Sequence, residues 1–267
     1  MTTRPDTARA DHLSVPTRRA RPMSGTATLA VTARVLTQLR RDHRTLAMLL
    51  VLPCALMSLL WWMFHSLPGD GFSQLGPALL ALIPFIIMFL VTSVTTLRER
   101  TSGTLERLLA MPMGKLDFLL GYALAFGLVA AVQSALAVAV CVWLLDLAVV
   151  GAVWMLMVVA VVDAVLGTAL GLFVSAFART EFQAVQFMPA LVIPQILLCG
   201  LFVPRDALPR VLEVVSDVLP LSYAVDAMRT VSASTQTGDV WKDVLLVAAY
   251  VVAGLALGAL TLRRQTP

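Results

Sequence analysis

The sequence predicts an all-α polytopic membrane protein, and two observations carry that prediction. Of its 267 residues, 59% are hydrophobic and 13% are charged, and the mean hydropathy is +0.86. An ordinary soluble domain is about 45–50% apolar and about 25% charged. The chain also contains six apolar stretches near the length, about 20 residues, that a helix needs to cross a bilayer. This composition excludes a soluble globule, and we expect no nucleic-acid partner.

The elements follow in order along the chain. Residues 1–23 contain almost no large apolar side chains and predict a disordered tail. In residues 24–45, an apolar stripe at helical spacing lies beside arginines, which predicts an amphipathic interfacial helix. The stripe is Leu29, Ala33, Leu36 and Leu39, and the arginines are Arg34, Arg40 and Arg41. A six-helix transmembrane domain is expected over 46–262, with spans at 46–64, 78–97, 118–145, 152–178, 184–203 and 244–262.

The connecting segments and the basic residues predict the orientation. Residues 98–117 form the expected cytoplasmic loop, 204–243 an extracytoplasmic re-entrant region, and 263–267 a cytoplasmic tail. With both termini in the cytoplasm, 16 Lys and Arg fall inside and four fall outside. Because cytoplasmic loops carry the excess of Lys and Arg, we expect both termini inside a plasma membrane that the chain crosses several times.

The loop RERTSGTLERLLAMPMGKLD is the most informative segment. Gly103 and Thr104 can start a short helix, and Glu106 falls in its first turn, where the helix dipole favours an anion. An amphipathic helix of this kind suits docking into a groove of a cytoplasmic partner. An ordinary charged loop that follows the positive-inside rule is the other interpretation.

Two segments resemble the ABC-2 type permeases, the membrane subunits of ATP-driven exporters that include daunorubicin-resistance and polysaccharide or lipid exporters. Residues 98–112, RERTSGTLERLLAMP, are similar to the family's E-R-x-x-G-T-L-E-x-L-L-x-x-P run between the second and third helices. Residues 219–229, LPLSYAVDAMR, resemble its N-P-L-x-Y-A-V-D-A-L-R stretch, with Leu219 in place of Asn and Met228 in place of Leu. The segment before the first span also resembles the family, although its common R-D-P is Arg41-Asp42-His43 here.

The resemblance implies an ABC-2 type permease fold and the permease subunit of an exporter. Such a subunit would move a hydrophobic or amphipathic substrate, drug-like or lipid-like, outward. It implies a permease dimer with two ATPase subunits that bind ATP and Mg. It also implies that the loop couples to the ATPase, with Glu106 and Arg107 as polar contacts and three leucines as the apolar surface that rests on the ATPase. The residues so implied are Arg100, Gly103, Thr104, Leu105, Glu106, Arg107, Leu108, Leu109 and Pro112.

No ATPase or enzyme is expected in this chain itself. A phosphate-binding loop needs G-x-x-x-x-G-K followed by Ser or Thr, but Gly114-Lys115 is followed by Leu116 and lacks the first Gly. The three His and three Cys residues are scattered without metal-ligand spacing, so we expect no metal site and no cofactor.

Asp163 is the ionisable residue deep in a predicted span. A charge there costs about 2.5–3.5 kcal/mol on insertion scales, so Asp163 should face the bundle interior or water, or be protonated. It could contact substrate, relay protons, or fix packing against Gln133, Gln195 or Ser134 on other helices. An ATP-independent, proton-coupled carrier that uses Asp163 is therefore the alternative function, and a membrane scaffold is a third.

Two further patterns concern packing. Gly167 with Gly171, and Gly254 with Gly258, form G-x-x-x-G pairs, which let helices approach closely within the chain or in a dimer. The five tryptophans lie near predicted span ends, as expected of side chains that anchor helices at the membrane interface.

Overall fold

The computed structural model describes residues 24–65, 71–102, 115–235 and 238–261. Within these ranges the chain is helical and has no strand. The expected tails at 1–23 and 263–267 lie outside them. The elements are α1 (Gly25–Arg41), α2 (His43–Phe64), α3 (Gly71–Thr101), α5 (Lys115–Ala139), the π-helix η1 (Val140–Leu144), α6 (Val153–Ser175), α7 (Glu181–Leu198), the 3-10 helix η2 (Arg205–Ala207), α8 (Arg210–Val218), α9 (Pro220–Ala233) and α10 (Gly238–Thr261).

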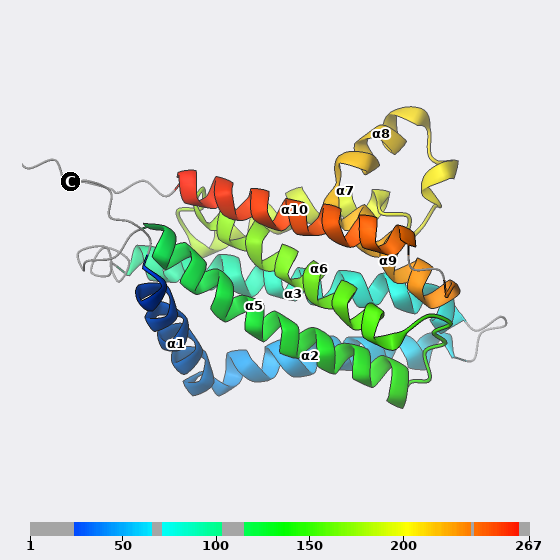
Figure 1. Cartoon of the computed structure of the whole chain (residues 1–267), viewed down its shortest axis with the longest axis horizontal. Helices are drawn as coiled ribbons and strands as arrows, with labels where there is room; N and C mark the ends of the chain where they lie inside the picture. The colour runs from blue at the N-terminus through cyan, green and yellow to red at the C-terminus, as the bar shows by residue number, and fades with distance from the viewer. Residues whose placement is uncertain (1–23, 66–70, 103–114, 236–237, 262–267) are drawn as a thin grey trace, which may run out of the picture.

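Six of these helices are long and apolar enough to cross a membrane, as the sequence predicts. They are α2, α3, α5 with its η1 extension, α6, α7 and α10. They run alongside one another in alternating directions, and α1 crosses one end of the bundle (Figure 1). The start of α1 and the end of α10 lie at this same end, which we call the α1 end. Both described ends of the chain are therefore on one side of the bundle.

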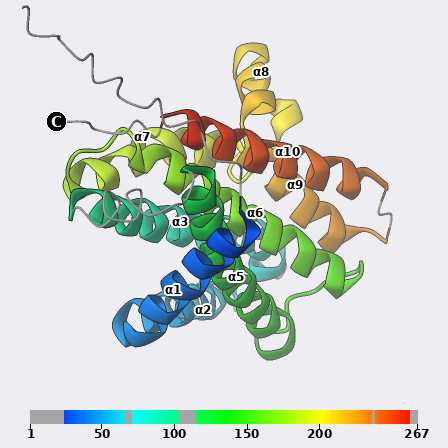
Figure 2. The same ribbon diagram turned by 60° about the vertical axis from the view of Figure 1, so that its left-hand side comes forward.

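Helix α6 is the centre of the bundle. It packs against α3, α5, α9 and α10, and Figure 2 shows these helices around it. A Cβ on Gly167 of α6 would overlap the carbonyl oxygen of Phe85, and one on Gly171 would lie 2.6 Å from that of Phe89. The first glycine pair thus brings the α6 backbone against α3. The second pair, on α10, faces Ala169 and Phe173 of α6 at ordinary distances of 3.6–3.7 Å.

The packed face of α1 differs from the expected stripe. Thr28, Val31, Val35 and Leu39 are buried, whereas Leu29 is 64% exposed and Ala33 is also exposed. The prediction shared only Leu39 with the face that is buried, with Leu36 partly covered. The stripe was expected to lie on the membrane and not on other helices, so that expectation stays a prediction. Close approach to α5 places β-branched side chains and Thr28 on the face that packs within the chain.

The third and fourth spans are joined by a short connection, close to the expected interruption between 145 and 152. Helix α5 ends in the π-helical turn Val140–Leu144, and α6 begins at Val153. Between them Asp146 has φ of 50°, a left-handed conformation that Asp tolerates better than most residues. The backbone of Gly151 then donates to the carbonyl of Val231 at 2.9 Å, which docks the connection onto the end of α9.

The region 204–243 contains two contrasting helices at the end opposite α1. Helix α9 packs against α3, α6 and α10. Helix α8 projects from the bundle (Figure 1) and buries only Ser216. Its apolar side chains are exposed in this chain, including Val211 at 75% and Val218 at 63%. The apolar stripe expected here is therefore present but not covered by the rest of the chain.

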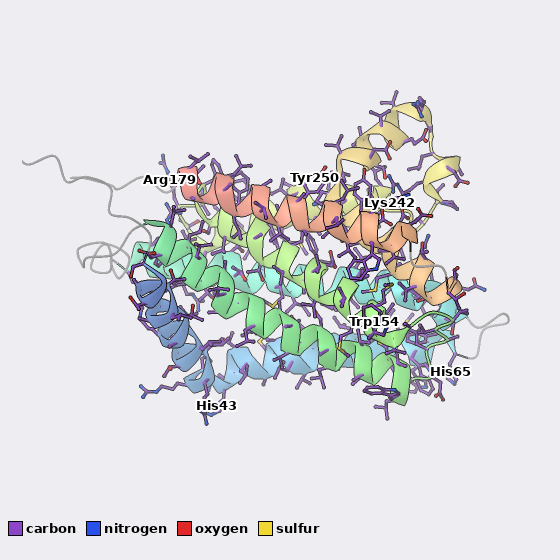
Figure 3. All side chains as sticks on the ribbon, viewed as in Figure 1. His43, His65, Trp154, Arg179, Lys242 and Tyr250 are labelled. Carbon is purple, nitrogen blue, oxygen red and sulfur yellow. The ribbon has the colours of Figure 1, made fainter. Side chains whose placement is uncertain are left out.

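The five tryptophans gather at the end opposite α1. Trp61 and Trp62 end α2, Trp143 lies in η1, and Trp154 and Trp241 begin α6 and α10. The rings of Trp154 and Trp241 are 6.3 Å apart. Figure 3 places Trp154 and Lys242 toward this end and His43 and Arg179 toward the other. The tryptophans thus cluster at the end that carries few basic residues.

Candidate functional site

The candidate coupling residues flank or fill the connection between α3 and α5. Arg100 lies in the last turn of α3. The others lie outside the described residues, so the structure gives no account of them: Gly103, Thr104, Leu105, Glu106, Arg107, Leu108, Leu109 and Pro112. What the structure does describe is how the two flanks of this loop are held.

Three consecutive residues at the end of α3 each reach a different helix. Arg98 donates two hydrogen bonds to Glu181 of α7, at 2.7 and 2.9 Å. Glu99 turns toward α1. The Arg100 guanidinium donates to the carbonyl oxygen of Ser175 at the end of α6. Because successive helical residues point about 100° apart, one turn of α3 connects three neighbouring helices next to the loop.

Glu99 is the buried member of this group, with 6% of its surface exposed. Its carboxylate accepts hydrogen bonds from Nη2 of Arg34 at 3.0 and 3.2 Å and from Nε2 of Gln38 at 3.1 Å. Arg34 and Gln38 are four residues apart, on one face of α1. Charge-assisted hydrogen bonds of this kind are stronger than neutral ones, so Glu99 fixes the end of α3 to α1.

Asp117 fixes the other flank of the loop to the same helix. It lies in the first turn of α5 and is 1% exposed. Its Oδ1 accepts from the backbone N–H of Ser24 at 2.9 Å and from the hydroxyl of Thr28 at 3.2 Å. Ser24 precedes the first turn of α1, so the carboxylate also satisfies a free N–H at a helix start. Helix α1 therefore contacts both ends of the loop.

A glycine allows α1 and α5 to touch. A Cβ on Gly121 would lie 2.6 Å from the Cβ of Val31, closer than side chains tolerate. The hydroxyl of Thr32 donates to the carbonyl oxygen of Gly121 at 3.2 Å. Side chains of α1 therefore contact the backbone of α5 directly at Gly121.

The bend between α1 and α2 is set by Asp42. Its carboxylate accepts from the backbone N–H of Thr45 at 3.1 Å and from the Thr45 hydroxyl at 2.6 Å, which caps the start of α2. These hydrogen bonds lower the pKa of Asp42 below its ordinary value. The family's usual Pro after the aspartate is His43 here, and the bend still forms.

Asp163 is buried in the middle of α6, with 1% of its surface exposed. Neither of its carboxylate oxygens has a hydrogen-bond partner in the described parts of the chain, and the same holds for both polar atoms of Gln133. Ser134 donates instead to the carbonyl of Ala160 at 3.1 Å. The expected hydrogen bonds from Gln133 and Ser134 to Asp163 are therefore not formed.

Gln195 makes contacts of its own on α7. Its Nε2 donates to the carbonyl of Leu191 at 3.0 Å, and its Oε1 accepts from the backbone N–H of Leu221 at 3.4 Å. It is 5% exposed. Gln195 therefore links α7 to α9 and does not bond Asp163.

The second motif, residues 219–229, lies in α9 at the opposite end and centres on Arg205. That guanidinium pairs with Asp217 and Asp226 and lies 5.3 Å from the ring centroid of Tyr223. Burial raises the pKa of Asp226, although Arg205 opposes this shift. Arg229 donates to the carbonyl oxygen of Gly200 at 2.6 Å. The motif thus ties α9 to the segment after α7.

Comparison with known proteins decides the family. The model of the ABC-2 type transporter family matches residues 26–232, which is more than half of the chain. The chain belongs to the ABC-2 type transporter family. The match runs from α1 through α9 and includes both flanks of the loop.

Curated members of the family are similar at low identity. ABC transporter G family member 20 of Dictyostelium discoideum is 25% identical over 194 residues, covering 72% of this chain and 27% of that protein. Probable multidrug ABC transporter permease YbhR of Escherichia coli K12 is 27% identical over 168 residues, covering 62% and 46%. Inner membrane transport permease YhhJ of the same strain is 24% identical over 147 residues, covering 55% and 39%. The part aligned with this chain thus covers less than half the length of each of these relatives.

Family membership and the six apolar helices make the chain a multi-pass protein of the plasma membrane. Among the described residues, no group of three His, Cys, Asp or Glu side chains is placed to hold a metal ion.

Sequence reasoning missed the residues that hold the loop flanks. Glu99 is part of the first motif, but its partners Arg34 and Gln38, and the second flank at Asp117, were not selected as site residues. One available signal was the spacing of Arg34 and Gln38, which places them on one face of a helix. Pairing that face with α3 required the tertiary structure.

Proposed function

We propose that this chain is the permease subunit of an ATP-binding-cassette exporter, which moves a hydrophobic or amphipathic substrate outward across the plasma membrane. The observation that carries the proposal is the family match over residues 26–232. A drug-like or lipid-like cargo is supported by the apolar spans and by the resemblance to a protein named a probable multidrug permease. A separate subunit would bind and hydrolyse ATP with Mg, and this chain would bind neither.

The loop between α3 and α5 is the proposed contact with that ATPase subunit. A short helix in the loop would start at Gly103 and Thr104 and end at Pro112. Glu106 and Arg107 would make polar contacts with the ATPase subunit. Apolar contacts would come from Leu105, Leu108 and Leu109. A push on the loop would reach α3 and α5 directly. It would also reach α1, because Glu99 and Asp117 bind both flanks to that helix. Arg98 and Arg100 would carry the same displacement to α7 and α6.

Two such permeases and two ATPases would form the working unit, with lipid around it. This part of the proposal rests on the family resemblance. It is compatible with the apolar residues that α2, α7 and α10 leave exposed in a single chain, among them Met48, Leu197 and Leu257. Pairwise cysteine crosslinks in native membranes, placed along α7, would detect a second copy.

The test is purification of the tagged chain from its own host in mild detergent. We expect a co-purifying subunit with a phosphate-binding loop, and ATP hydrolysis that is lost with Glu106→Arg. The matched control is Glu213→Arg, a charge reversal on α8 at the opposite end of the bundle. Among the charged residues that the structure describes, Glu213 pairs only with its neighbour Arg210. Retention of both complex and activity in Glu106→Arg would contradict the coupling role.

A further inference from the structure

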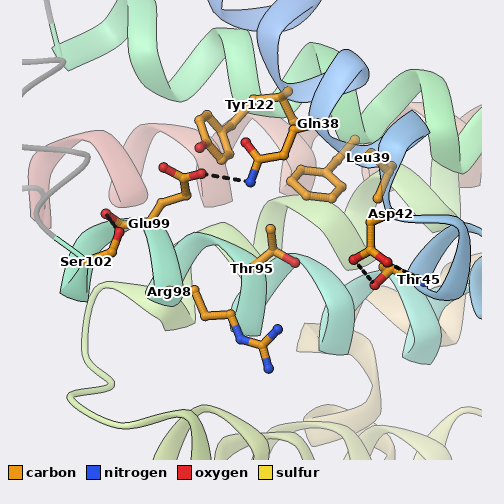
Figure 4. Close-up of a pocket in the computed structure, with 11 residues that line it drawn as sticks. Gln38, Leu39, Asp42, Thr45, Thr95, Arg98, Glu99, Ser102 and Tyr122 are labelled. Atoms are coloured by element: carbon orange, nitrogen blue, oxygen red, sulfur yellow. Dashed lines mark hydrogen bonds between the residues drawn. The ribbon is translucent and has the colours of Figure 1, made fainter.

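A pocket of about 340 Å³ lies at the α1 end, between α1, the start of α2, the end of α3 and α5. One wall is apolar and partly aromatic, formed by Val35, Leu39, Tyr122 and Phe126. The rim is polar, and Figure 4 shows Glu99 and Asp42 on opposite sides of it with Thr95 between them. The volume falls within the range of about 300–1,000 Å³ that is typical of small-molecule sites.

The rim carries two carboxylates, Asp42 and Glu99, of which Asp42 has no direct salt bridge among the described residues. Asp42 has no ion-pair partner within 4.0 Å in the described segments. Its carboxylate accepts from Thr45, and Arg44 and Arg98 interact with it electrostatically from further away. The hydrogen bonds to Thr45 hold the pKa of Asp42 low, so the carboxylate is ionised at neutral pH. Arg98, which also lines the pocket, is already bound through two hydrogen bonds to Glu181. A ligand cation could therefore contact the Asp42 carboxylate directly, although Arg44 and Arg98 partly offset its charge.

The apolar wall contains a polar atom without a satisfied hydrogen bond. The side chain of Tyr122 is 1% exposed. Its hydroxyl lies near both Glu99 and Arg34, although no hydrogen bond of normal geometry joins it to any residue in the described ranges. Buried hydroxyls are nearly always bonded, so a polar group in the pocket would complete this one. The rings of Tyr122 and Phe126 also offer faces that attract a cation.

We propose that this pocket binds an amphiphile whose headgroup carries an ammonium group, with the ammonium near Asp42 and Glu99 and the apolar part against Leu39, Tyr122 and Phe126. Two sources have this chemistry: a membrane phospholipid with an ethanolamine headgroup, and a free amphiphilic amine. For the phospholipid, the exposed Arg41 and Arg44 beside Asp42 are placed to meet its phosphate. The site requires no ATPase subunit, so it stands or falls independently of the proposed function.

Native mass spectrometry of the purified chain in a nonionic detergent measures the binding. The probes are phosphatidylethanolamine, phosphatidylglycerol with the same acyl chains, and octadecylamine. We expect phosphatidylethanolamine to bind more tightly than phosphatidylglycerol. If octadecylamine also binds and competes, the ammonium alone suffices. If it does not, the phosphate contributes and the ligand is the phospholipid.

Two variants and one control locate the site. Asp42→Asn removes the charge and keeps a residue that caps helices equally well. Its affinity for phosphatidylethanolamine should fall about fivefold or more, the effect of losing one charge-assisted contact. Thr95→Leu fills the pocket and should weaken binding of every amine probe. Asp239→Asn removes an exposed carboxylate at the opposite end and should change nothing.

Three results would overturn the proposal. These are equal binding of the two phospholipids, unchanged binding in Asp42→Asn, and an equal loss in Asp239→Asn, which would indicate unspecific attraction. Thermal melting in the same detergent checks that each variant is folded. If Thr95→Leu does not fold, Asp42→Asn and its control decide the question.

Discussion

Glu99 accepts hydrogen bonds from Arg34 and Gln38 at the point where α3 meets α1, and it is nearly excluded from solvent. Glu99→Gln would leave the Arg34 guanidinium without its counter-charge. We expect a loss of about 1–3 kcal/mol in the free energy of unfolding, the range for hydrogen bonds to charged groups. Denaturant unfolding of the detergent-solubilised chain measures it, and Arg34→Met combined with Glu99→Gln should show a non-additive loss.

The control for this prediction is Glu213→Gln. Glu213 pairs with Arg210 three residues away on an exposed helix, and such pairs contribute about 0.2–0.5 kcal/mol. Equal losses in the free energy of unfolding for the Glu99 and Glu213 variants would mean that the contact between Glu99 and α1 does not stabilise the fold.

Asp163 distinguishes the two transport mechanisms, because a proton-coupled carrier would need its carboxyl group and an ATP-driven exporter would not. Its carboxyl group has no hydrogen-bond partner in the part of the chain that the structure describes. Asp163→Asn therefore removes a group that can carry a proton, at nearly unchanged volume and without breaking a bond. If the chain is driven by a partner ATPase, substrate export should be largely retained. Export measured in the host, with protein level and melting temperature as controls, is the test. Loss of export from a folded Asp163→Asn protein would favour the proton-coupled carrier.

At the scale of helices, the sequence predicted what length and hydropathy determine. All six membrane-crossing helices were expected, because about 20 apolar residues in a row leave a chain in lipid little choice other than a helix. The face that a helix packs against its neighbours was harder to predict. The buried face of α1 depends on a glycine of α5 almost ninety residues away. The bonds of Glu99, Asp117 and Gln195 likewise join residues far apart in sequence, so no local pattern specifies them.

The two glycine pairs predict opposite results for the same substitution. Gly167→Ala would place a Cβ against the backbone carbonyl of Phe85, which cannot move without separating α3 from α6. We expect a loss of about 1–3 kcal/mol, as for other overpacked sites. Gly254→Ala meets its nearest atom at 3.6 Å and should be neutral or slightly stabilising, because Ala favours helices.

Melting temperatures of the two variants in one detergent compare them directly. A Gly167→Ala protein as stable as the Gly254→Ala protein would contradict the close packing of α3 on α6. A large loss only for Gly254→Ala in membranes, where a second copy is present, would instead point to α10 as a contact between chains.

At the scale of the whole molecule, most of the described basic residues and the five tryptophans lie at opposite ends of the bundle. Basic residues on α1 and at the ends of α3 and α6 lie at the α1 end, and the five tryptophans lie at the other. Since Lys and Arg are enriched on the cytoplasmic side, we predict that the α1 end faces the cytoplasm.

With Cys54, Cys141 and Cys199 replaced by Ser, single cysteines at the exposed positions Arg179 and Lys242 report on the two ends. A membrane-impermeant thiol reagent should label Lys242→Cys in intact cells and Arg179→Cys only after permeabilisation. The reverse pattern would place the loop between α3 and α5 outside the cell, beyond the reach of any cytoplasmic ATPase, and would refute the proposed coupling together with the orientation.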